Sequence, residues 1–302
     1  MYAITGATGN IGSKIADTLL ARGEKVRVIG RNAARLQRFV DKGAEASVGD
    51  LKDGAFVARA FAGATAVFAM IPPEFSARDF RAYQNEVGGN LAAAIKTSGV
   101  RNVVNLSSQG ADLSEGTGPI LGLRDQEARL NGLSGVNVLH LRPTFFMENL
   151  LMDIPLINQK GIIGSAVRGD QEFAMIATRD IAAHAAERLV KRDFSGSTVQ
   201  DLLGERDLSF NEATAVIGRE IGMPGLKYVQ FPYEDAANWL MEMGVGKDLS
   251  RLFIEMNKAL NDGLFAVNRP RTRDTTTPTS IEEFAAVTFS RLFAAAAPRK
   301  AA

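Results

Sequence analysis

Short apolar runs alternate with longer amphipathic segments along the first half of the chain. The apolar runs are nearly continuous and rich in valine and isoleucine, as is typical of parallel strands covered on both faces. They predict strands at Tyr2–Thr5, Val26–Gly30, Ala46–Gly49, Ala66–Ile71, Asn102–Leu106 and Asn137–Leu141. The segments between them predict helices at Ile11–Arg22, Ala33–Asp41, Gly54–Phe61, Arg78–Ser98 and Leu123–Leu130. This alternation predicts an α/β protein with a doubly wound parallel sheet.

The regular alternation of predicted strands and helices ends after Arg142 and Pro143. A helix at Arg179–Val190 and a strand at Ser197–Leu202 still fit the sheet layer. Further helices are predicted at Asn149–Gln159, Ser209–Ile221, Tyr233–Met243, Leu249–Leu260 and Ile281–Phe293, with turns at Gly161, Gly164 and Pro224–Gly225. We expect residues 1–150, rejoined by roughly 178–203, to form the core. We expect the remainder of 151–302 to form a smaller, discontinuous, mostly helical substrate-side region.

Composition excludes several classes of site. The 302 residues include 35 basic and 34 acidic side chains, so no overall field favours nucleic acid or a membrane surface. The absence of cysteine excludes disulfides, thiolate nucleophiles and cysteine metal sites. The two histidines, His140 and His184, lie far apart in sequence, so we expect no transition-metal site.

The chain carries no predicted targeting or membrane segment. Residues 1–5 lead directly into a glycine motif and leave no room for a signal peptide. No apolar run approaches the roughly 20 residues that a membrane-spanning helix needs. We therefore expect a cytoplasmic protein.

The sequence TGATGNIG, at Thr5–Gly12, joins the first predicted strand to the first predicted helix. Gly6 permits a tight turn, Gly9 lets the backbone approach a pyrophosphate, and Gly12 lets the helix pack closely on the sheet. Free N–H groups at the start of the helix attract an anion. A glycine-rich turn without a ligand is the alternative, but this position favours a Rossmann-type dinucleotide site. We assign to it Gly6, Thr8, Gly9, Asn10, Ile11 and Gly12.

With its Gly-x-x-Gly-x-x-Gly spacing, this loop resembles that of the short-chain dehydrogenase/reductase superfamily, in particular its atypical, NmrA-like branch. Later segments resemble the same branch at the same relative places. They are VRVIGRN (26–32), GDL (49–51), FAMIPP (68–73), NLSS (105–108), LRPTFFMEN (141–149) and RDIA (179–182). The resemblance covers roughly residues 1–200 and continues more weakly to TPTSIEEFA at Thr277–Ala285.

The end of the second predicted strand indicates which dinucleotide is bound. Proteins that choose NAD usually place Asp or Glu there, to bind the ribose 2′-hydroxyl. This chain reads VIGRNAARLQR instead, with no carboxylate. Arg31 can bind a phosphate, with Asn32 or Arg35 adding a donor. Arg35 could equally lie on the solvated face of the next helix, where we expect Arg38. The pattern favours NADP(H).

The resemblance implies roles for residues that the spacing alone does not assign. It implies that Asp50 and Leu51 border the adenine, and that Ile71 and Pro72 line the ribose side of the cofactor. It also implies that the Pro143–Phe145 loop borders the nicotinamide, and that Ser107 and Ser108 bind cofactor or substrate by hydrogen bonds. We place the substrate pocket at Ser108, Gln109, Phe145, Phe146 and Asn149.

The usual acid–base pair of short-chain reductases is missing. Such enzymes protonate their product from a tyrosine that is followed four residues later by a lysine. None of the four tyrosines here (Tyr2, Tyr83, Tyr228 and Tyr233) has a lysine at that spacing, and no lysine lies between Lys96 and Lys160. Arg124 is the nearest basic residue to the expected place. Its pKa is too high for proton donation near neutral pH, and a solvated helix position is the alternative.

Two functional classes remain. One is a reductase that transfers hydride from NADPH to a small, electron-poor, quinone-like acceptor, for which water supplies the proton. The other is a catalytically inactive NADP(H)-sensing protein that acts through a protein partner. The NmrA-like branch includes both kinds, and we favour the reductase.

An apolar wall would suit a flat aromatic acceptor, although each of its residues could equally belong to ordinary core packing. Candidates are Phe145, Phe146, Met147, Met152, Phe173 and Met175. Trp239 would either cap the pocket or anchor its helix. We expect His140 and His184 to be structural.

Overall fold

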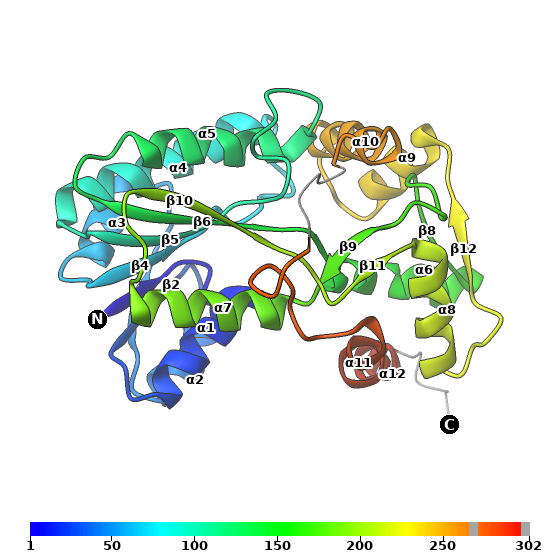
Figure 1. Ribbon diagram of the computed structural model, residues 1–302, viewed down its shortest axis with the longest axis horizontal. Coiled ribbons are helices and arrows are strands. Elements are labelled where there is room, and N and C mark those ends of the chain that lie inside the picture. Colours follow the sequence, from blue (N-terminus) through cyan, green and yellow to red (C-terminus); the bar gives the residue numbers. More distant parts are fainter. Residues whose placement is uncertain (266–270, 297–302) are drawn as a thin grey trace.

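A computed structural model describes residues 1–265 and 271–296. Its centre is a seven-stranded sheet with the strand order β10-β6-β5-β4-β1-β2-β3 (Figure 1). All neighbouring strands of this sheet run parallel. The strands are β1 (Tyr2–Ile4), β2 (Val26–Gly30), β3 (Glu45–Val48), β4 (Ala66–Ala69), β5 (Asn102–Leu106), β6 (Asn137–Pro143) and β10 (Ser197–Leu202). The predicted α/β, Rossmann-type, doubly wound fold is confirmed.

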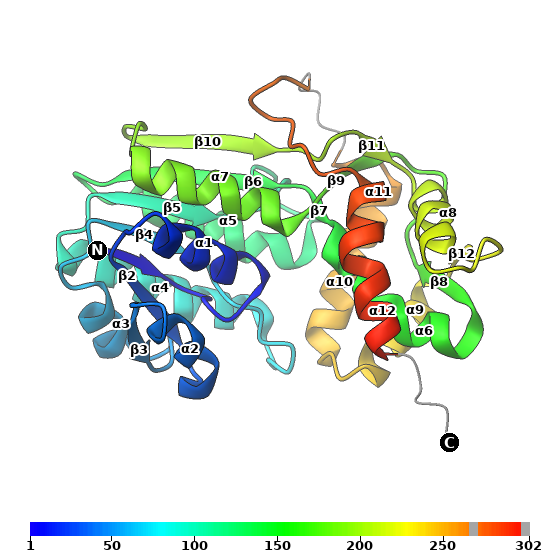
Figure 2. The same cartoon turned by 90° about the horizontal axis from the view of Figure 1, so that it is seen from below.

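Helices cover both faces of this sheet (Figures 1 and 2). One face carries α1 (Asn10–Ala21), α2 (Ala33–Val40) and α7 (Thr178–Lys191), which share a buried cluster with the strands. The other face carries α3 (Gly54–Phe61), α4 (Phe80–Ser98) and α5 (Leu121–Asn131) over a second cluster. All six helices were predicted, and their ends differ from the predicted ones by two residues at most.

Local chemistry sets the ends of several helices. Asn32, Asp53 and Asp79 cap α2, α3 and α4, because each side chain accepts a hydrogen bond from a backbone N–H in the first turn. At the other end of α4, Gly99 has φ 74°, a left-handed conformation that glycine adopts without strain. These local signals explain why the sequence located the helices of this part so closely.

The substrate-side region is richer in strands than predicted. Its helices are α6 (Ile154–Lys160), α8 (Phe210–Glu220), α9 (Tyr233–Glu242), α10 (Lys247–Asn261), α11 (Ile281–Phe284) and α12 (Ser290–Ala296). A π-helical turn at Ala285–Phe289 joins the last two. Three-stranded and two-stranded sheets lie among them. Their strands are β7 (Phe145–Phe146), β9 (Phe173–Ile176), β11 (Asp207–Leu208), β8 (Ile162–Ser165) and β12 (Lys227–Gln230).

Two predictions in this region were wrong. Gly164 lies inside β8 and not in a turn. The single helix predicted at Asn149–Gln159 is a 3₁₀ helix, η2 (Met147–Asp153), followed by α6 with Pro155 in its first turn. Proline lacks the N–H that would continue the preceding helix, so a new helix starts there. Strands of two to four residues are too short to show a periodicity, which explains why the sequence missed them.

Part of the predicted substrate-side region, residues 266–270 and 297–302, lies outside the described residues. Across the ranges that the structure does describe, no helix combines the length and the apolar character needed to cross a bilayer.

A buried ion pair joins α5 to the end of β6. Arg142 donates to Glu127 twice, from Nε at 2.9 Å and from Nη2 at 2.6 Å. Glu127 is 5% exposed and Arg142 is 8% exposed. Ser107, which follows β5, donates its hydroxyl to the same carboxylate at 2.5 Å. Burial acts to raise the pKa of Glu127, but the hydrogen bonds from Arg142 and Ser107 outweigh it and hold the pKa below its ordinary value.

Glu127→Gln is expected to lower the free energy of unfolding at pH 7 by about 3–5 kcal/mol, because it removes the buried counter-charge of the Arg142 guanidinium. The guanidinium then keeps only the exposed Asp112 carboxylate, at 3.6 Å. Urea unfolding measures the change. Glu45→Gln is the control. The Glu45 carboxylate is 51% exposed in its pair with Arg27, and exposed pairs contribute at most about 1 kcal/mol.

The pH dependence gives a second check on the same pair. A carboxyl whose pKa is lowered by folding stabilises the folded state above its unfolded pKa, and this contribution is lost as the pH falls through the folded pKa. The stabilities of the parent and Glu127→Gln should therefore converge in acid. Equal stability of the two proteins at pH 7 would contradict a stabilising role for the pair.

Candidate functional site

The glycine loop lies at the carboxyl edge of the sheet, between β1 and α1. Gly6 has φ +62°, which favours glycine, and a Cβ added to Gly12 would lie only 2.4 Å from the Gly6 carbonyl oxygen. The N–H of Gly9 closes the turn on that same oxygen at 2.9 Å. No side chain caps α1 at Gly9. The first N–H groups of α1 are therefore available to an anion, as a dinucleotide phosphate requires.

A cavity of about 350 Å³ adjoins this loop. Its lining combines the loop with the start of α2 and consists of Thr8, Gly9, Asn10, Ser13, Ala34, Arg35 and Arg38. Arg35 reaches the loop and donates from Nη2 to the Thr8 carbonyl oxygen at 2.9 Å. Arg38, expected on a solvated face, lines the same cavity and pairs with Asp17 at 3.2 Å. Two arginines thus face the site of the glycine loop. Ile11 and Gly12 are buried in the first turn of α1.

Arg31 has a different partner. It follows β2, with its side chain 64% exposed, and its Nη1 lies 3.2 Å from Glu74 Oε2 on the loop after β4. A hydrogen bond from Ser76, and then the one from Arg31, lower the pKa of Glu74. An ionised carboxylate therefore stands beside the arginine that the sequence assigned to phosphate binding. Asn32 caps α2, because its Oδ1 accepts from the Arg35 N–H at 3.1 Å.

The other assigned cofactor residues lie on loops at the same edge. Asp50 is exposed after β3, and its Oδ1 accepts from the Lys52 N–H at 2.9 Å. Leu51 and Ile71 are buried in the cluster beneath α3 and α4. Pro72 follows, and its carbonyl oxygen accepts from the Tyr83 hydroxyl at 2.8 Å. Ser107 is buried beside Glu127.

All five residues assigned to the substrate pocket line one cavity of about 230 Å³, together with Pro143. The full lining is Ser108, Gln109, Ile120, Pro143, Thr144, Phe145, Phe146, Asn149, Phe173, Met256, Leu260 and Phe265. None of these described residues carries a charge. The sequence analysis missed Ile120, Phe265 and the contribution of α10, and it placed Thr144 only within the loop that borders the nicotinamide. Met256 and Leu260 lie more than a hundred residues beyond the other assigned positions, and no sequence signal connects them.

Aromatic rings form one wall of this cavity. Phe145 and Phe173 meet edge to face with ring centres 5.6 Å apart, and both contact Phe210 in the same way. The methionines predicted for this wall lie elsewhere. Met147 and Met175 are buried in the core of the substrate-side region, and Met152 is 46% exposed at the surface. The wall is therefore aromatic, and its shape would suit a flat ring.

Three of the tyrosine hydroxyls are engaged in the structure. Tyr83 donates to Pro72, Tyr228 donates to the Val167 carbonyl oxygen at 2.6 Å, and Tyr233 accepts from Asn261 at 2.9 Å. Burial raises the pKa of Tyr83 to about 12 and also raises the pKa of Tyr228. A raised pKa makes a hydroxyl a poorer proton donor.

The histidines have the partners expected of structural residues. His140, 1% exposed, lies between Asn105 at 3.1 Å and Asn131 at 2.8 Å. Burial lowers the pKa of its imidazole, so the ring is neutral at pH 7. His184 lies 2.9 Å from Gln200.

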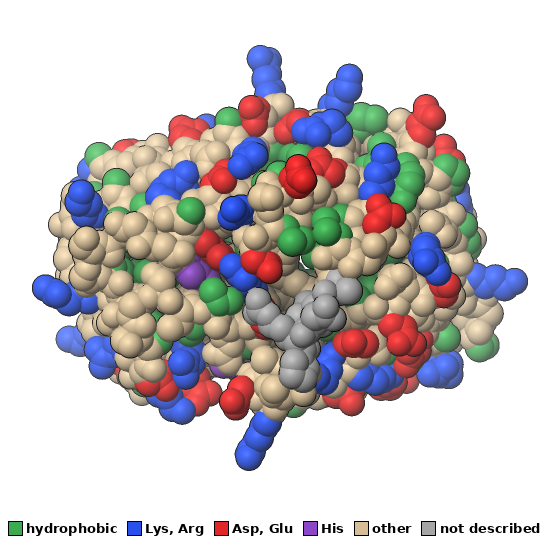
Figure 3. All heavy atoms as spheres, turned by 45° about the horizontal axis from the view of Figure 1, so that its top comes forward, with side chains coloured by type: hydrophobic (Ala, Val, Ile, Leu, Met, Phe, Trp, Pro, Cys, Tyr) green, Lys and Arg blue, Asp and Glu red, His purple; other side chains and the backbone are tan. Residues whose placement is uncertain are grey.

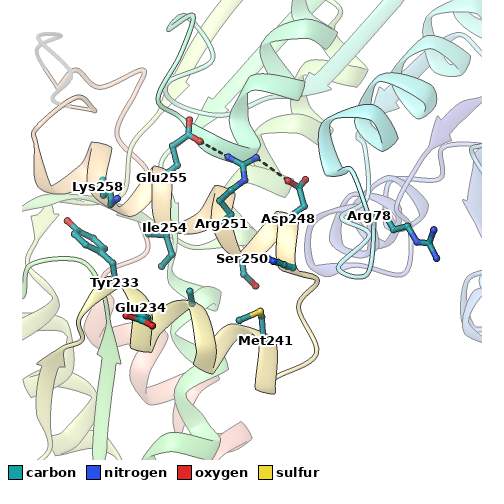
Figure 4. A pocket seen from close by; sticks show the side chains of 12 residues that line it. Arg78, Tyr233, Glu234, Met241, Asp248, Ser250, Arg251, Ile254, Glu255 and Lys258 are labelled. Atoms are coloured by element: carbon teal, nitrogen blue, oxygen red, sulfur yellow. Dashed lines mark hydrogen bonds and ion pairs between the residues drawn. The ribbon is translucent and has the colours of Figure 1, made fainter.

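A larger hollow of about 750 Å³ lies between α9 and α10 (Figure 4). Three of its charged side chains pair with one another, since Arg251 lies 3.0 Å from Asp248 and 3.5 Å from Glu255. Arg78 points away from the other side chains in this view (Figure 4). The two helices lie away from β1 and α1 (Figure 1). This hollow is therefore separate from the glycine-loop site.

Charges of both signs are interspersed on the face shown in Figure 3, and its hydrophobic side chains form small groups. This surface agrees with the near balance of 35 basic and 34 acidic residues.

Two known proteins are similar to this chain over most of its length. NAD(P)H azoreductase of Xenophilus azovorans is 28% identical over 260 residues, which cover 85% of this chain and 86% of that protein. Quinone oxidoreductase 2 of Escherichia coli K12 is 26% identical over 269 residues, which cover 87% of this chain and 89% of that protein.

The crystal structure of the Escherichia coli NADPH-dependent quinone oxidoreductase QOR2, in complex with NADPH, has the same fold, with a TM-score of 0.79 at 22% identity. That comparison covers 96% of this chain and 100% of the other. The model of the NmrA-like family matches residues 2–293. This chain belongs to the NmrA-like family.

Proposed function

We propose that this chain is an NADP(H)-dependent reductase that acts on a small, uncharged, electron-poor acceptor of the quinone type. One observation carries the proposal: the glycine loop, with its arginine-lined cavity, shares a sheet edge with an uncharged cavity walled by aromatic rings. The names of the azoreductase and quinone oxidoreductase relatives support the same class of reaction.

The described residues fit NADP(H). The N-terminus of α1, from Gly9 to Gly12, would hold the pyrophosphate, and Arg31, Asn32 and Arg35 would bind the phosphate of the adenosine ribose. The remaining assigned contacts are Asp50, Leu51, Ile71, Pro72, Ser107 and Pro143. When bound, NADPH supplies a hydride from its nicotinamide. We also propose that residues 1–150 and roughly 178–203 bind the cofactor, and that the rest covers the acceptor.

The residues of the chain would position the acceptor and exclude water from it. The rings of Phe145, Phe146 and Phe173 would hold a flat acceptor, and the apolar side chains of α10 would cover it. No carboxylate, lysine or histidine is among the described residues that line this cavity. Water therefore supplies the proton that the reduced acceptor takes up.

The first prediction from this proposed function concerns turnover. The parent protein should oxidise NADPH when it is given uncharged quinones, and more slowly or not at all when it is given acceptors with a sulfonate or carboxylate. The reason is that the described residues of the cavity offer no charged partner for such groups. Absorbance at the NADPH maximum measures the rate. Tight NADPH binding without oxidation by any quinone, enone or azo dye would contradict the proposal and favour a cofactor-sensing protein.

The second prediction concerns the choice of cofactor. A charge-assisted hydrogen bond contributes about 1.5–3 kcal/mol, so Arg31→Ala and Arg35→Ala should each weaken NADPH binding roughly ten- to a hundredfold. The affinity for NADH should change little, because NADH lacks the phosphate. Calorimetry measures both affinities.

Arg22→Ala is the control, since Arg22 is exposed at the opposite end of α1. Salt gives an independent check, because an exposed phosphate contact is screened. The affinity for NADPH should fall with ionic strength more steeply than that for NADH. Equal losses of both cofactors in the arginine variants would refute these assignments.

The third prediction concerns proton supply. Tyr83→Phe, Tyr228→Phe and Tyr233→Phe should each leave kcat within a few-fold of the parent value, because these hydroxyls are engaged with backbone or amide groups. Steady-state kinetics at pH 7 measures the effect. A loss of about a hundredfold or more in one variant, as expected for a general acid, would identify a proton-donating tyrosine.

A further inference from the structure

Two serine hydroxyls at the carboxyl edge already have acceptors. The Ser107 hydroxyl donates to Glu127 at 2.5 Å, and that carboxylate is held ionised by Arg142. The Ser108 hydroxyl donates to the Gln109 carbonyl oxygen at 3.0 Å. Each hydroxyl has a single proton to donate. Neither serine therefore has a proton left for the oxygen of an acceptor.

Thr144 differs from both serines. It lies between the end of β6 and the start of β7, is 6% exposed, and lines the acceptor cavity. Its backbone N–H donates to the Leu202 carbonyl oxygen at 3.2 Å, which fixes the main chain at this point. Its Oγ1 is buried and has no hydrogen-bond partner among the described residues.

An unpaired buried hydroxyl is costly to a fold and calls for an explanation. The hydroxyls of Thr117 and Thr214 are also buried without a hydrogen-bond partner among the described residues. Neither of these two residues lines the cavity. Of the three residues, Thr144 alone lines the cavity.

We propose that the Thr144 hydroxyl donates a hydrogen bond to the carbonyl oxygen of a quinone acceptor bound in this cavity. This inference rests on the proposed reductase function and names the residue that recognises the acceptor. The aromatic wall would hold the plane of the ring, and Thr144 would hold one of its oxygens.

The electron balance explains why such a donor matters. The quinone takes up one hydride, so it gains two electrons and one proton while NADPH is oxidised to NADP⁺. The electron pair displaced from the C=O bond settles on the oxygen, and water supplies the second proton. A hydrogen bond to the resulting oxyanion is about twice as strong as one to a neutral carbonyl, so the donor favours the transition state. Thr144 keeps its own proton throughout.

The test compares two variants with a matched control. Thr144→Val removes the hydroxyl and keeps the shape, and Thr144→Ser keeps the hydroxyl. Thr214→Val, in α8, removes a buried and equally unpartnered hydroxyl away from the cavity. Three quantities are measured: steady-state kinetics with menadione, menadione binding to the protein loaded with NADP⁺, and NADPH affinity. Thermal unfolding checks that each variant is folded.

Thr144→Val is expected to lower kcat with menadione by about ten- to a hundredfold, at or below the loss seen on removing one donor from an oxyanion hole. It should also weaken menadione binding. Thr144→Ser should stay within a few-fold of the parent, as should Thr214→Val. The affinity for NADPH should not change. The midpoint of thermal unfolding should hold or rise in both valine variants, because each loses an unpaired buried hydroxyl.

Two results would contradict the proposed role of Thr144, and a third would separate that role from the reductase function. Parent-like kinetics and menadione binding in Thr144→Val would overturn the inference. Equal losses of menadione affinity and NADPH affinity in this variant would also overturn it, because they would assign the hydroxyl to the cofactor. If the parent binds menadione through Thr144 but does not reduce it, the contact stands and the reductase function fails.

Discussion

The contact between the start of α1 and the carbonyl of Gly6 is the constraint on which the site depends. Because Gly12 has no Cβ, the helix approaches that oxygen more closely than any other residue would allow. This approach directs the free N–H groups of α1 towards the cavity that Arg35 and Arg38 line. The anion-binding end of the site therefore follows from the geometry of one strand–loop–helix turn, to which the neighbouring α2 adds positive charge.

The buried pair of Glu127 and Arg142 takes up the charges near the cavity that we propose for the acceptor. In this chain α5 carries a carboxylate that binds an arginine and the Ser107 hydroxyl, and it carries no tyrosine–lysine pair. The ionic groups near the ends of β5 and β6 thus satisfy one another, and none of the described residues that line the adjoining cavity carries a charge. Such a cavity would suit an acceptor that only has to be positioned and hydrogen-bonded. An electron-poor acceptor is of this kind, because its electron deficiency favours the uptake of hydride.

The two parts of the chain meet in that cavity. β6 ends at Pro143, and within two residues the chain enters β7 and the substrate-side region. Thr144 and Phe145 are therefore held by the sheet on one side and by β9 on the other, while Met256 and Leu260 approach from α10. Loops at the carboxyl edge of a parallel sheet commonly form such sites, since every strand end converges there.

The sequence by itself determined the sheet, the six helices that cover it, the glycine loop and the missing tyrosine–lysine pair. It also placed Ser108, Gln109, Phe145, Phe146 and Asn149 together, and these residues do line one cavity. These features depend on short-range periodicity, turn chemistry and strand ends, all of which can be read within a few residues.

Only the tertiary structure decided which side chains have partners, which are buried in the core and which line the cavity. It paired Arg31 with Glu74, buried Met147 and Met175, and brought Met256 and Leu260 to the cavity. Among the described residues it also left the Thr144 hydroxyl without a hydrogen-bond partner, whereas Ser107 and Ser108 have theirs. The physical reason is that a hydrogen bond or a packing contact depends on the distance between groups far apart in sequence, and local pattern does not specify that distance.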